Sequence, residues 1–177
     1  GFIAGPADVI DFLRVQSRSF MFTAAAVPAA AGAALGALRI IRSAEGPELM
    51  DKVLANARYL HDGLAELGYD VREPNRLPDG GDLITPIVPV LVGDDWRAVL
   101  LWKALYDAGV YVNVALYPAV QRGGALLRTS VMATHERTHL DRALSIFEQV
   151  KDDVDRMAPP DGVVPATTPE AGADEVA

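Results

Sequence analysis

The sequence predicts a domain of the α/β or α+β class, in which several helices pack on a small sheet. Two observations lead to this class. Apolar residues repeat at helical spacing in several segments, and in the second half of the chain these segments alternate with short strand-like runs. Half of the 177 residues are hydrophobic, which is enough to build a core. One domain is the simplest expectation for this length.

Charge and cysteine content exclude several classes of function. The net charge of −8 argues against a nucleic-acid surface, because phosphate binding needs concentrated Lys and Arg. The absence of cysteine removes disulfides, thiolate chemistry and cysteine-based zinc sites, and it fits a reducing compartment such as the cytoplasm. The chain opens on Gly1 without a basic segment before an apolar one, so we expect no signal peptide.

The first quarter of the chain predicts a strand end and two helices. Gly1–Gly5 has the character of the end of a strand, and Asp8–Gln16 that of a short helix. Phe20–Leu38 carries no charge and approaches the length of a membrane span. Its alanines and glycines insert weakly into lipid, so we expect no membrane span. We expect a buried helix from about Ala25 to Ser43, with Pro28 in its first turn.

The next segment predicts a long helix, a loop and a strand. Pro47 suits the first position of a helix, and Gly68 suits the residue after its end. Glu73–Asp82 is typical of a loop, and Ile84–Val92 of a strand. Two prolines favour an edge strand or an irregular strand over a regular central one: Pro86 and Pro89.

The following helix has clear start and stop signals. Asp94 or Asp95 can cap a helix over Trp96–Ala108, and Gly109 ends it. Val110–Leu116 then predicts another strand.

The C-terminal region predicts one amphipathic helix and a tail. Apolar residues share one face over Glu136–Met157. Residues 158–177 lack large apolar side chains other than valine, so we expect a disordered tail. The pattern alone contains no nucleophile with a base, no metal cluster and no phosphate loop.

The stretch Ala125–Glu136 is the main candidate for function. It predicts a strand that presents Arg128 and then turns into a helix, which Thr134 can cap. An arginine beside leucines needs an anionic partner, and its planar fork of donors suits a carboxylate. From the residue alone, a structural salt bridge inside the protein is the alternative.

Six short stretches of the sequence resemble those of a known family. Short stretches occur in the order and spacing of one family: Gly1–Gly5, Val9–Arg14, Ser17–Thr23, Ile87–Asp94, Tyr117–Val120 and Leu127–His135. Together they resemble the α-oxoamine synthases, pyridoxal-phosphate enzymes of the fold-type I, class I/II aminotransferase-like group. The resemblance covers roughly residues 1–155. Members of the family include 8-amino-7-oxononanoate synthase, serine palmitoyltransferase and glycine C-acetyltransferase.

The resemblance implies a fold and an activity. Residues 1–45 would be the end of the cofactor-binding large domain with a long linking helix. Residues 46–157 would be the C-terminal small domain, with a small, mainly antiparallel sheet and packed helices. The family condenses an acyl-CoA with a small amino acid (glycine, alanine or serine), releases carbon dioxide and forms an α-oxoamine. The full-length enzyme would be a cytoplasmic homodimer that uses pyridoxal 5′-phosphate.

The resemblance also assigns residues. Arg128 matches the arginine that binds the amino-acid carboxylate. Thr23 and Ala24 match the position that contacts the cofactor phosphate from the partner subunit, although Thr23 also suits an ordinary helix cap. His135 is expected to be structural.

The Schiff-base lysine of the family is expected upstream of this chain, and none of the three lysines present matches it: Lys52, Lys103 and Lys151. We therefore expect a C-terminal portion with no catalytic residue and no metal ligand, inactive by itself and exposing its helix over 25–43.

Three alternatives remain open at this point. The chain could be a catalytically silent subunit of such an enzyme, or another class I/II aminotransferase-like protein. It could also be an unrelated small α/β or membrane-associated protein.

Overall fold

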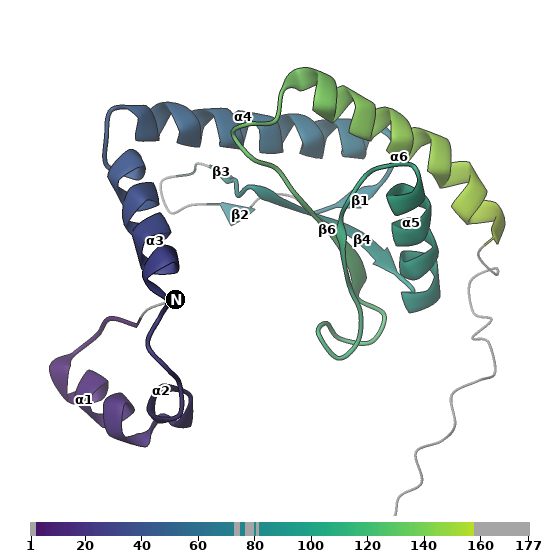
Figure 1. Ribbon diagram of the computed structural model, residues 1–177. Coiled ribbons are helices and arrows are strands. Elements are labelled where there is room, and N and C mark those ends of the chain that lie inside the picture. Colours follow the sequence, from purple (N-terminus) through teal and green to yellow (C-terminus); the bar gives the residue numbers. More distant parts are fainter. Residues whose placement is uncertain (1–2, 73–74, 77–79, 81, 158–177) are drawn as a thin grey trace, which may run out of the picture. The chain divides into compact units, whose positions relative to one another are not determined.

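The computed structural model describes residues 3–72, 75–76, 80 and 82–157. The chain divides into two compact units, an N-terminal unit of residues 1–47 and a C-terminal unit of residues 48–177 (Figure 1). The predicted tail, residues 158–177, lies outside the described residues. The predicted strand end at Gly1–Gly5 is not found over its described part, Ile3–Gly5.

The N-terminal unit contains three helices: α1 (Ala7–Gln16), α2 (Arg18–Met21) and α3 (Pro28–Ile41). The first confirms the predicted short helix. The helix predicted from Ala25 begins only at Pro28, because a residue before proline favours extended backbone, and Val27 has φ −63° and ψ 139°. No residue of α1, α2 or α3 is buried. The prediction of a buried helix is therefore wrong for this chain, whereas the expected exposure of its apolar side chains is observed.

The remaining elements run in the following order: α4 (Glu45–Glu66), β1 (Asp70–Val71), β2 (Asn75–Arg76), β3 (Asp82–Leu83), β4 (Ile87–Gly93), α5 (Asp95–Asp107), β5 (Asn113–Ala115), β6 (Ala125–Ser130) and α6 (Arg137–Met157). Four strands form one antiparallel sheet in the order β1-β4-β6-β5, and β2 pairs with β3 in a separate ribbon. The ribbon lies within the segment that was predicted to be a loop.

The predicted start at Pro47 is wrong by two residues, because α4 begins at Glu45, whereas three other local end signals are confirmed. Gly68 and Gly109 follow α4 and α5 with φ values of +75° and +94°, which a residue with a side chain rarely adopts. Asp94 is the N-cap of α5, and its Oδ1 accepts a 2.7 Å hydrogen bond from the backbone N–H of Arg97.

The prediction of an edge position for the proline-containing strand is wrong, because β4 lies between β1 and β6, whereas the alternative of an irregular strand agrees with a register shift between Leu91 and Gly93. The register explains how Pro89 is tolerated there. Val131 N–H donates to the Pro86 carbonyl, so even-numbered residues of β4 bond toward β6 and Pro89 faces the other side. On that side β1 pairs only with Val90 and Leu91. No described residue of β1 pairs with Pro89, so the lack of an N–H at this position costs no hydrogen bond between strands.

Three helices cover one face of the sheet and enclose the core. α4, α5 and α6 contribute buried residues such as Leu64, Leu105 and Phe147, which pack with Val90 and Leu127 of the sheet. Figure 1 shows α4 and α6 running along the same side of the strands. The C-terminal unit is thus a two-layer structure with a small antiparallel sheet and packed helices, as predicted, and the other face of the sheet carries the side chains described next.

Candidate functional site

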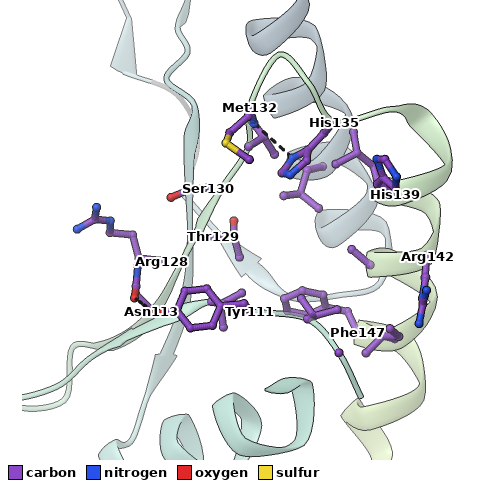
Figure 2. A pocket seen from close by; sticks show the side chains of 18 residues that line it. Tyr111, Asn113, Arg128, Thr129, Ser130, Met132, His135, His139, Arg142 and Phe147 are labelled. Atoms are coloured by element: carbon purple, nitrogen blue, oxygen red, sulfur yellow. Dashed lines mark hydrogen bonds between the residues drawn. The ribbon is translucent and has the colours of Figure 1, made fainter. Parts of the chain in front are cut away.

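The pleat of β6 presents Arg128 on the face of the sheet opposite the helices. Leu127 is fully buried and Thr129 is 3 % exposed, and the Thr129 hydroxyl donates a 2.7 Å hydrogen bond to the Val88 carbonyl. Arg128 and Ser130 alternate with them and are exposed. Figure 2 shows Arg128 and Ser130 on one side of the strand and Thr129 on the other.

Arg128 lies in the middle of a row across three strands. Its register partners are Pro89 on β4 and Asn113 on β5. Asn113 is exposed, and its Oδ1 accepts a 3.4 Å hydrogen bond from the Tyr111 hydroxyl. Within the described residues no carboxylate forms an ion pair with Arg128, so the alternative of an internal salt bridge is not observed there. An exposed guanidinium of this kind can bind a carboxylate through two parallel hydrogen bonds.

A cavity of about 580 Å³ extends from Arg128 to α6. It follows β6 past the end of β5, where Thr129, Ser130 and Val131 have no partner on the β5 side. Among the described residues that line it there is no Asp or Glu, although the chain has a net charge of −8. The lining includes two arginines and two histidines: Arg128, Arg142, His135 and His139. The cavity therefore favours an anionic ligand over a cationic one.

The turn that joins β6 to α6 is held by side chains that the sequence analysis did not identify. The amide Nδ2 of Asn56, on α4, donates to the carbonyls of Met132 and His135 at 3.0 and 2.9 Å. The Nδ1 of His135 accepts from the Met132 N–H at 3.3 Å, which agrees with a structural role for this histidine. No sequence pattern points to Asn56, because its partners lie 76 and 79 residues away.

The start of α6 is capped by a histidine and not by Thr134. The Nδ1 of His139 accepts a 3.1 Å hydrogen bond from the Glu136 N–H. This is the return half of a capping box, in which a side chain on the first turn bonds the N–H of the cap residue. Thr134 makes no side-chain hydrogen bond with the described residues. The predicted threonine cap is therefore wrong.

Thr23 and Ala24 lie in the segment between α2 and α3 and are exposed. The Thr23 hydroxyl donates to the Ser19 carbonyl. The interpretation of Thr23 as a helix cap is wrong, because α3 begins at Pro28 and its N-cap is Val27. The hydroxyl oxygen of Thr23 and the backbone N–H groups of this exposed segment are the features that could contact a phosphate.

Each of the three lysines contacts another group of the fold. Lys52 bonds Glu136 Oε1 at 3.0 Å, Lys103 pairs with Asp107 one turn along α5, and Lys151 donates to the Leu67 carbonyl. The Lys52 hydrogen bond and charge hold the pKa of the Glu136 carboxyl below its usual value. Over the described residues, no group of three or more His, Asp and Glu could bind a metal ion.

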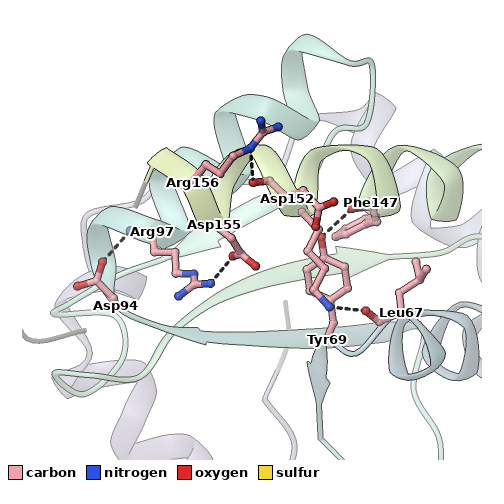
Figure 3. Close-up of polar contacts among 9 residues, drawn as sticks. Leu67, Tyr69, Asp94, Arg97, Phe147, Asp152, Asp155 and Arg156 are labelled. Atoms are coloured by element: carbon pink, nitrogen blue, oxygen red, sulfur yellow. Dashed lines mark hydrogen bonds and ion pairs between the residues drawn. The ribbon is translucent and has the colours of Figure 1, made fainter. Parts of the chain in front are cut away.

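A second polar cluster lies toward the other end of α6 (Figure 3). The Tyr69 hydroxyl donates to the Phe147 carbonyl at 2.8 Å, and Arg97 forms an ion pair with Asp155. Burial, together with the charges of Asp155 and Asp152, raises the pKa of Tyr69 well above its ordinary value. Tyr69, Arg97 and Asp155 are each paired within the fold, so the cluster joins α6 to α5 and to the residue before β1 and is not a second candidate site.

Comparison with known proteins gives matches over most of the chain. The family "Aminotransferase class I and II" matches residues 1–147. The 8-amino-7-oxononanoate synthase of Petrotoga mobilis is 36 % identical over 150 residues, which are 85 % of this chain and 35 % of the relative. The serine palmitoyltransferase of Bacteriovorax stolpii is 34 % identical over 151 residues, 85 % of this chain and 33 % of the relative.

A solved structure matches as well. Serine palmitoyltransferase with a PLP internal aldimine aligns with a TM-score of 0.68 at 30 % identity, covering 84 % of this chain and 35 % of the other. The predicted fold is therefore confirmed as part of a PLP-dependent transferase fold. The chain spans about a third of the length of the curated relatives it matches. In the part of the chain that the structure describes, no helix is both long and apolar enough to cross a bilayer.

Proposed function

The chain belongs to the aminotransferase class I and II family, and we propose that it is the C-terminal portion of a pyridoxal-phosphate-dependent acyl-CoA:amino acid C-acyltransferase. The reaction is the decarboxylative condensation of an acyl-CoA with a small amino acid, which gives an α-oxoamine. The similarity to 8-amino-7-oxononanoate synthase and serine palmitoyltransferase supports this reaction class. A cytoplasmic location and a homodimeric full-length enzyme complete the proposal.

The observation that carries the proposal is the state of Arg128. Its guanidinium is exposed on the helix-free face of the sheet and has no ion pair within the described chain. Its neighbours in the row, Pro89 and Asn113, are uncharged. A substrate carboxylate would therefore meet a preformed fork of donors without displacing a protein carboxylate. In this proposal Arg128 binds and orients the amino acid.

The cofactor, when bound, accepts the electron pair of the substrate carbanion. This chain contributes Thr23 and Ala24 to that site, as contacts to the cofactor phosphate in the partner subunit. The exposed hydroxyl of Thr23 and the uncapped backbone around it support this assignment. The lysines of the chain do not fit the covalent link, because each is engaged with another group. The catalytic residues of the whole enzyme are therefore proposed to lie outside this chain.

The proposal is tested by Arg128→Ala in the full-length protein. Loss of a charge-assisted, bidentate contact to a carboxylate costs on the order of 2–4 kcal/mol, so the amino-acid KM should rise by about 30-fold to 1,000-fold. Cofactor binding, followed by its visible absorbance, should persist. Arg58→Ala is the matched control, because Arg58 is an exposed arginine on α4. Unchanged affinity for the amino acid in Arg128→Ala would refute the assignment.

The paired lysines also favour a second candidate, in which this chain is a catalytically silent subunit. Both candidates predict that the chain by itself forms no covalent link with pyridoxal phosphate. After incubation with the cofactor and reduction with borohydride, peptide mass spectrometry should detect no adduct on Lys52, Lys103 or Lys151. A stoichiometric adduct on one of them would contradict both. Activity of the full-length protein then separates the two candidates.

A further inference from the structure

We propose that Asn56 is a positioning residue for Arg128: by fixing the turn at the end of β6, it determines where the guanidinium lies. The inference rests on the proposed role of Arg128 in carboxylate binding. It concerns a residue on α4 that touches neither substrate nor cofactor and acts through the backbone of another element.

The contacts of Asn56 are specific and shielded from water. Its side chain is 9 % exposed. The single amide nitrogen donates to two carbonyls, those of Met132 at 3.0 Å and His135 at 2.9 Å. Both N–H bonds of the amide are therefore in use, and they bridge the two ends of one turn. Without this amide the Met132 carbonyl would keep its bond from the His135 N–H, whereas the His135 carbonyl would lose the donor from α4, so the link between α4 and the turn depends on Asn56.

The other hydrogen bonds of the turn are local, and they include the bond from the Met132 N–H to the His135 Nδ1 at 3.3 Å. The sheet ladder ends at Ser130, and the last backbone bond to β4 is from Val131 N–H to the Pro86 carbonyl at 2.9 Å. Inside the turn, His135 N–H bonds the Met132 carbonyl at 3.1 Å. These bonds are local to the turn or precede it. Among the described residues, Asn56 supplies the hydrogen bonds that a side chain of another element makes to the backbone of the turn.

A second link from α4 reaches the same region but is weaker. Lys52 lies one helical turn before Asn56 and pairs with Glu136 at 3.0 Å. Both side chains of that pair are largely exposed, at 45 % and 63 %, and exposed ion pairs contribute little. The buried amide is therefore the main constraint, and Lys52 provides a natural comparison.

The geometry connects the turn to Arg128. Asn113–Arg128 is the last pair between β5 and β6, so beyond Arg128 the strand has a neighbour only on the β4 side. Met132 lies four positions further along the same strand direction. Movement of the turn would therefore reach Arg128 through three residues whose strand pairing is on the β4 side only, two of which, Thr129 and Val131, are also buried. Misplacement of a binding group by about 1 Å can change a rate by about 100-fold.

The test is Asn56→Leu in the full-length enzyme, which keeps the size of the side chain and removes both donors. We expect the amino-acid KM to rise by about 10-fold to 100-fold, with the KM for acyl-CoA unchanged. Asn56→Asp gives a second reading, because a carboxyl group donates one hydrogen bond only while it is protonated. Its amino-acid KM should be intermediate at low pH and rise with pH.

Two controls separate positioning from simple destabilisation. Val154→Ala truncates a buried side chain, 2 % exposed, near the other end of α6, so it should lower Tm without changing the amino-acid KM. Lys52→Gln should leave both nearly unchanged. If Asn56→Leu and Asn56→Asp lower Tm but keep the amino-acid KM, as Val154→Ala does, the inference is overturned. If Arg128→Ala itself keeps the KM, the proposed function fails instead.

Discussion

The two units differ in whether they contain a core of their own. In the C-terminal unit Phe147 is 1 % exposed and contacts the edge of Tyr69, with ring centroids 5.3 Å apart. In the N-terminal unit Phe12 and Phe22 are 63 % and 83 % exposed, and α1, α2 and α3 bury nothing. The C-terminal unit is therefore stabilised from within. Over the described residues of the N-terminal unit, the apolar side chains of its helices do not form a core of their own.

The comparison separates the two parts of the proposed site. Arg128 is carried by a strand of the unit that has its own core, whereas Thr23 and Ala24 are carried by the unit that lacks one. The carboxylate-binding part should therefore keep its geometry in the isolated chain, and the phosphate contact should form only in the complete protein.

We expect the largest effect on stability when truncation of the buried Phe147 is compared with truncation of the exposed Phe12. Phe147→Ala should lower the free energy of unfolding by about 3–5 kcal/mol, because it leaves a cavity in the core. Phe12→Ala should change it by less than about 0.5 kcal/mol, since its side chain is already in water. Urea unfolding of this chain, followed by far-UV circular dichroism, measures both. Equal losses for the two variants would show that the units share one core.

Two neighbours on β6 sharpen the same comparison within the C-terminal unit. Leu127→Ala should cost about 2–5 kcal/mol of stability, because its side chain is fully buried. Arg128→Ala should leave stability within about 0.5 kcal/mol, since the exposed guanidinium has no described ion-pair partner. Thermal unfolding of both variants provides the measurement. A large loss in Arg128→Ala would indicate a structural role and argue against the proposed one.

At Tyr69 we expect a moderate effect on the free energy of unfolding, and this effect should depend on pH. Burial raises the pKa of its hydroxyl above the ordinary 10.0, so the folded chain holds this proton more tightly than the unfolded chain. Its contribution to stability is fully present below about pH 10 and is lost as the pH rises further. Tyr69→Phe should remove that alkaline loss and cost about 1 kcal/mol at neutral pH through the missing bond to Phe147.

Urea unfolding of both proteins at pH 7 and above pH 10 measures this effect. A parallel alkaline decline in the wild-type chain and in Tyr69→Phe would contradict the assignment of the titration to this residue.

The smallest effect is expected at the exposed pair of Lys52 and Glu136. The lysine lowers the pKa of the carboxyl group, so the contribution of the pair is present above the unfolded value near 4.5 and is lost as the pH falls. Because both groups face water, Lys52→Gln should shift Tm only slightly at pH 7 and not at all in acid. Differential scanning calorimetry at the two pH values tests this, and a larger shift in acid than at pH 7 would refute it.

Local signals in the sequence predicted the elements well where neighbouring residues determine the structure. Gly68, Gly109 and Asp94 end or begin helices through their own backbone or side chain, so a short window was sufficient. Arg128 was found in the same way, from an arginine beside buried leucines in a strand-like run. Its role remains a prediction, as do those of Thr23 and Ala24.

Features that depend on distant residues could not be predicted. The central place of β4 depends on β1, which is only two residues long and has no clear pattern. The capping of α6 by His139 could not be predicted, because Thr134 was an equally plausible cap residue in the sequence. The exposure of α3 could not be predicted from its composition. A helix rich in alanine and glycine suits close packing, and its sequence is the same whether or not the surface that would cover it is present.

The proline in β4 has a consequence for association between molecules. On the side of β4 that faces β1, the Ile87 N–H bonds the Thr85 hydroxyl at 3.4 Å, Pro89 has no N–H, and Leu91 pairs with Asp70. Over Ile87–Leu91, as far as the described residues show, this side of the strand therefore offers no free N–H donor to the backbone of another chain. Strand edges with free donors promote aggregation. Pro89 thus lets a very short β1 border the sheet without exposing a template for intermolecular strand addition.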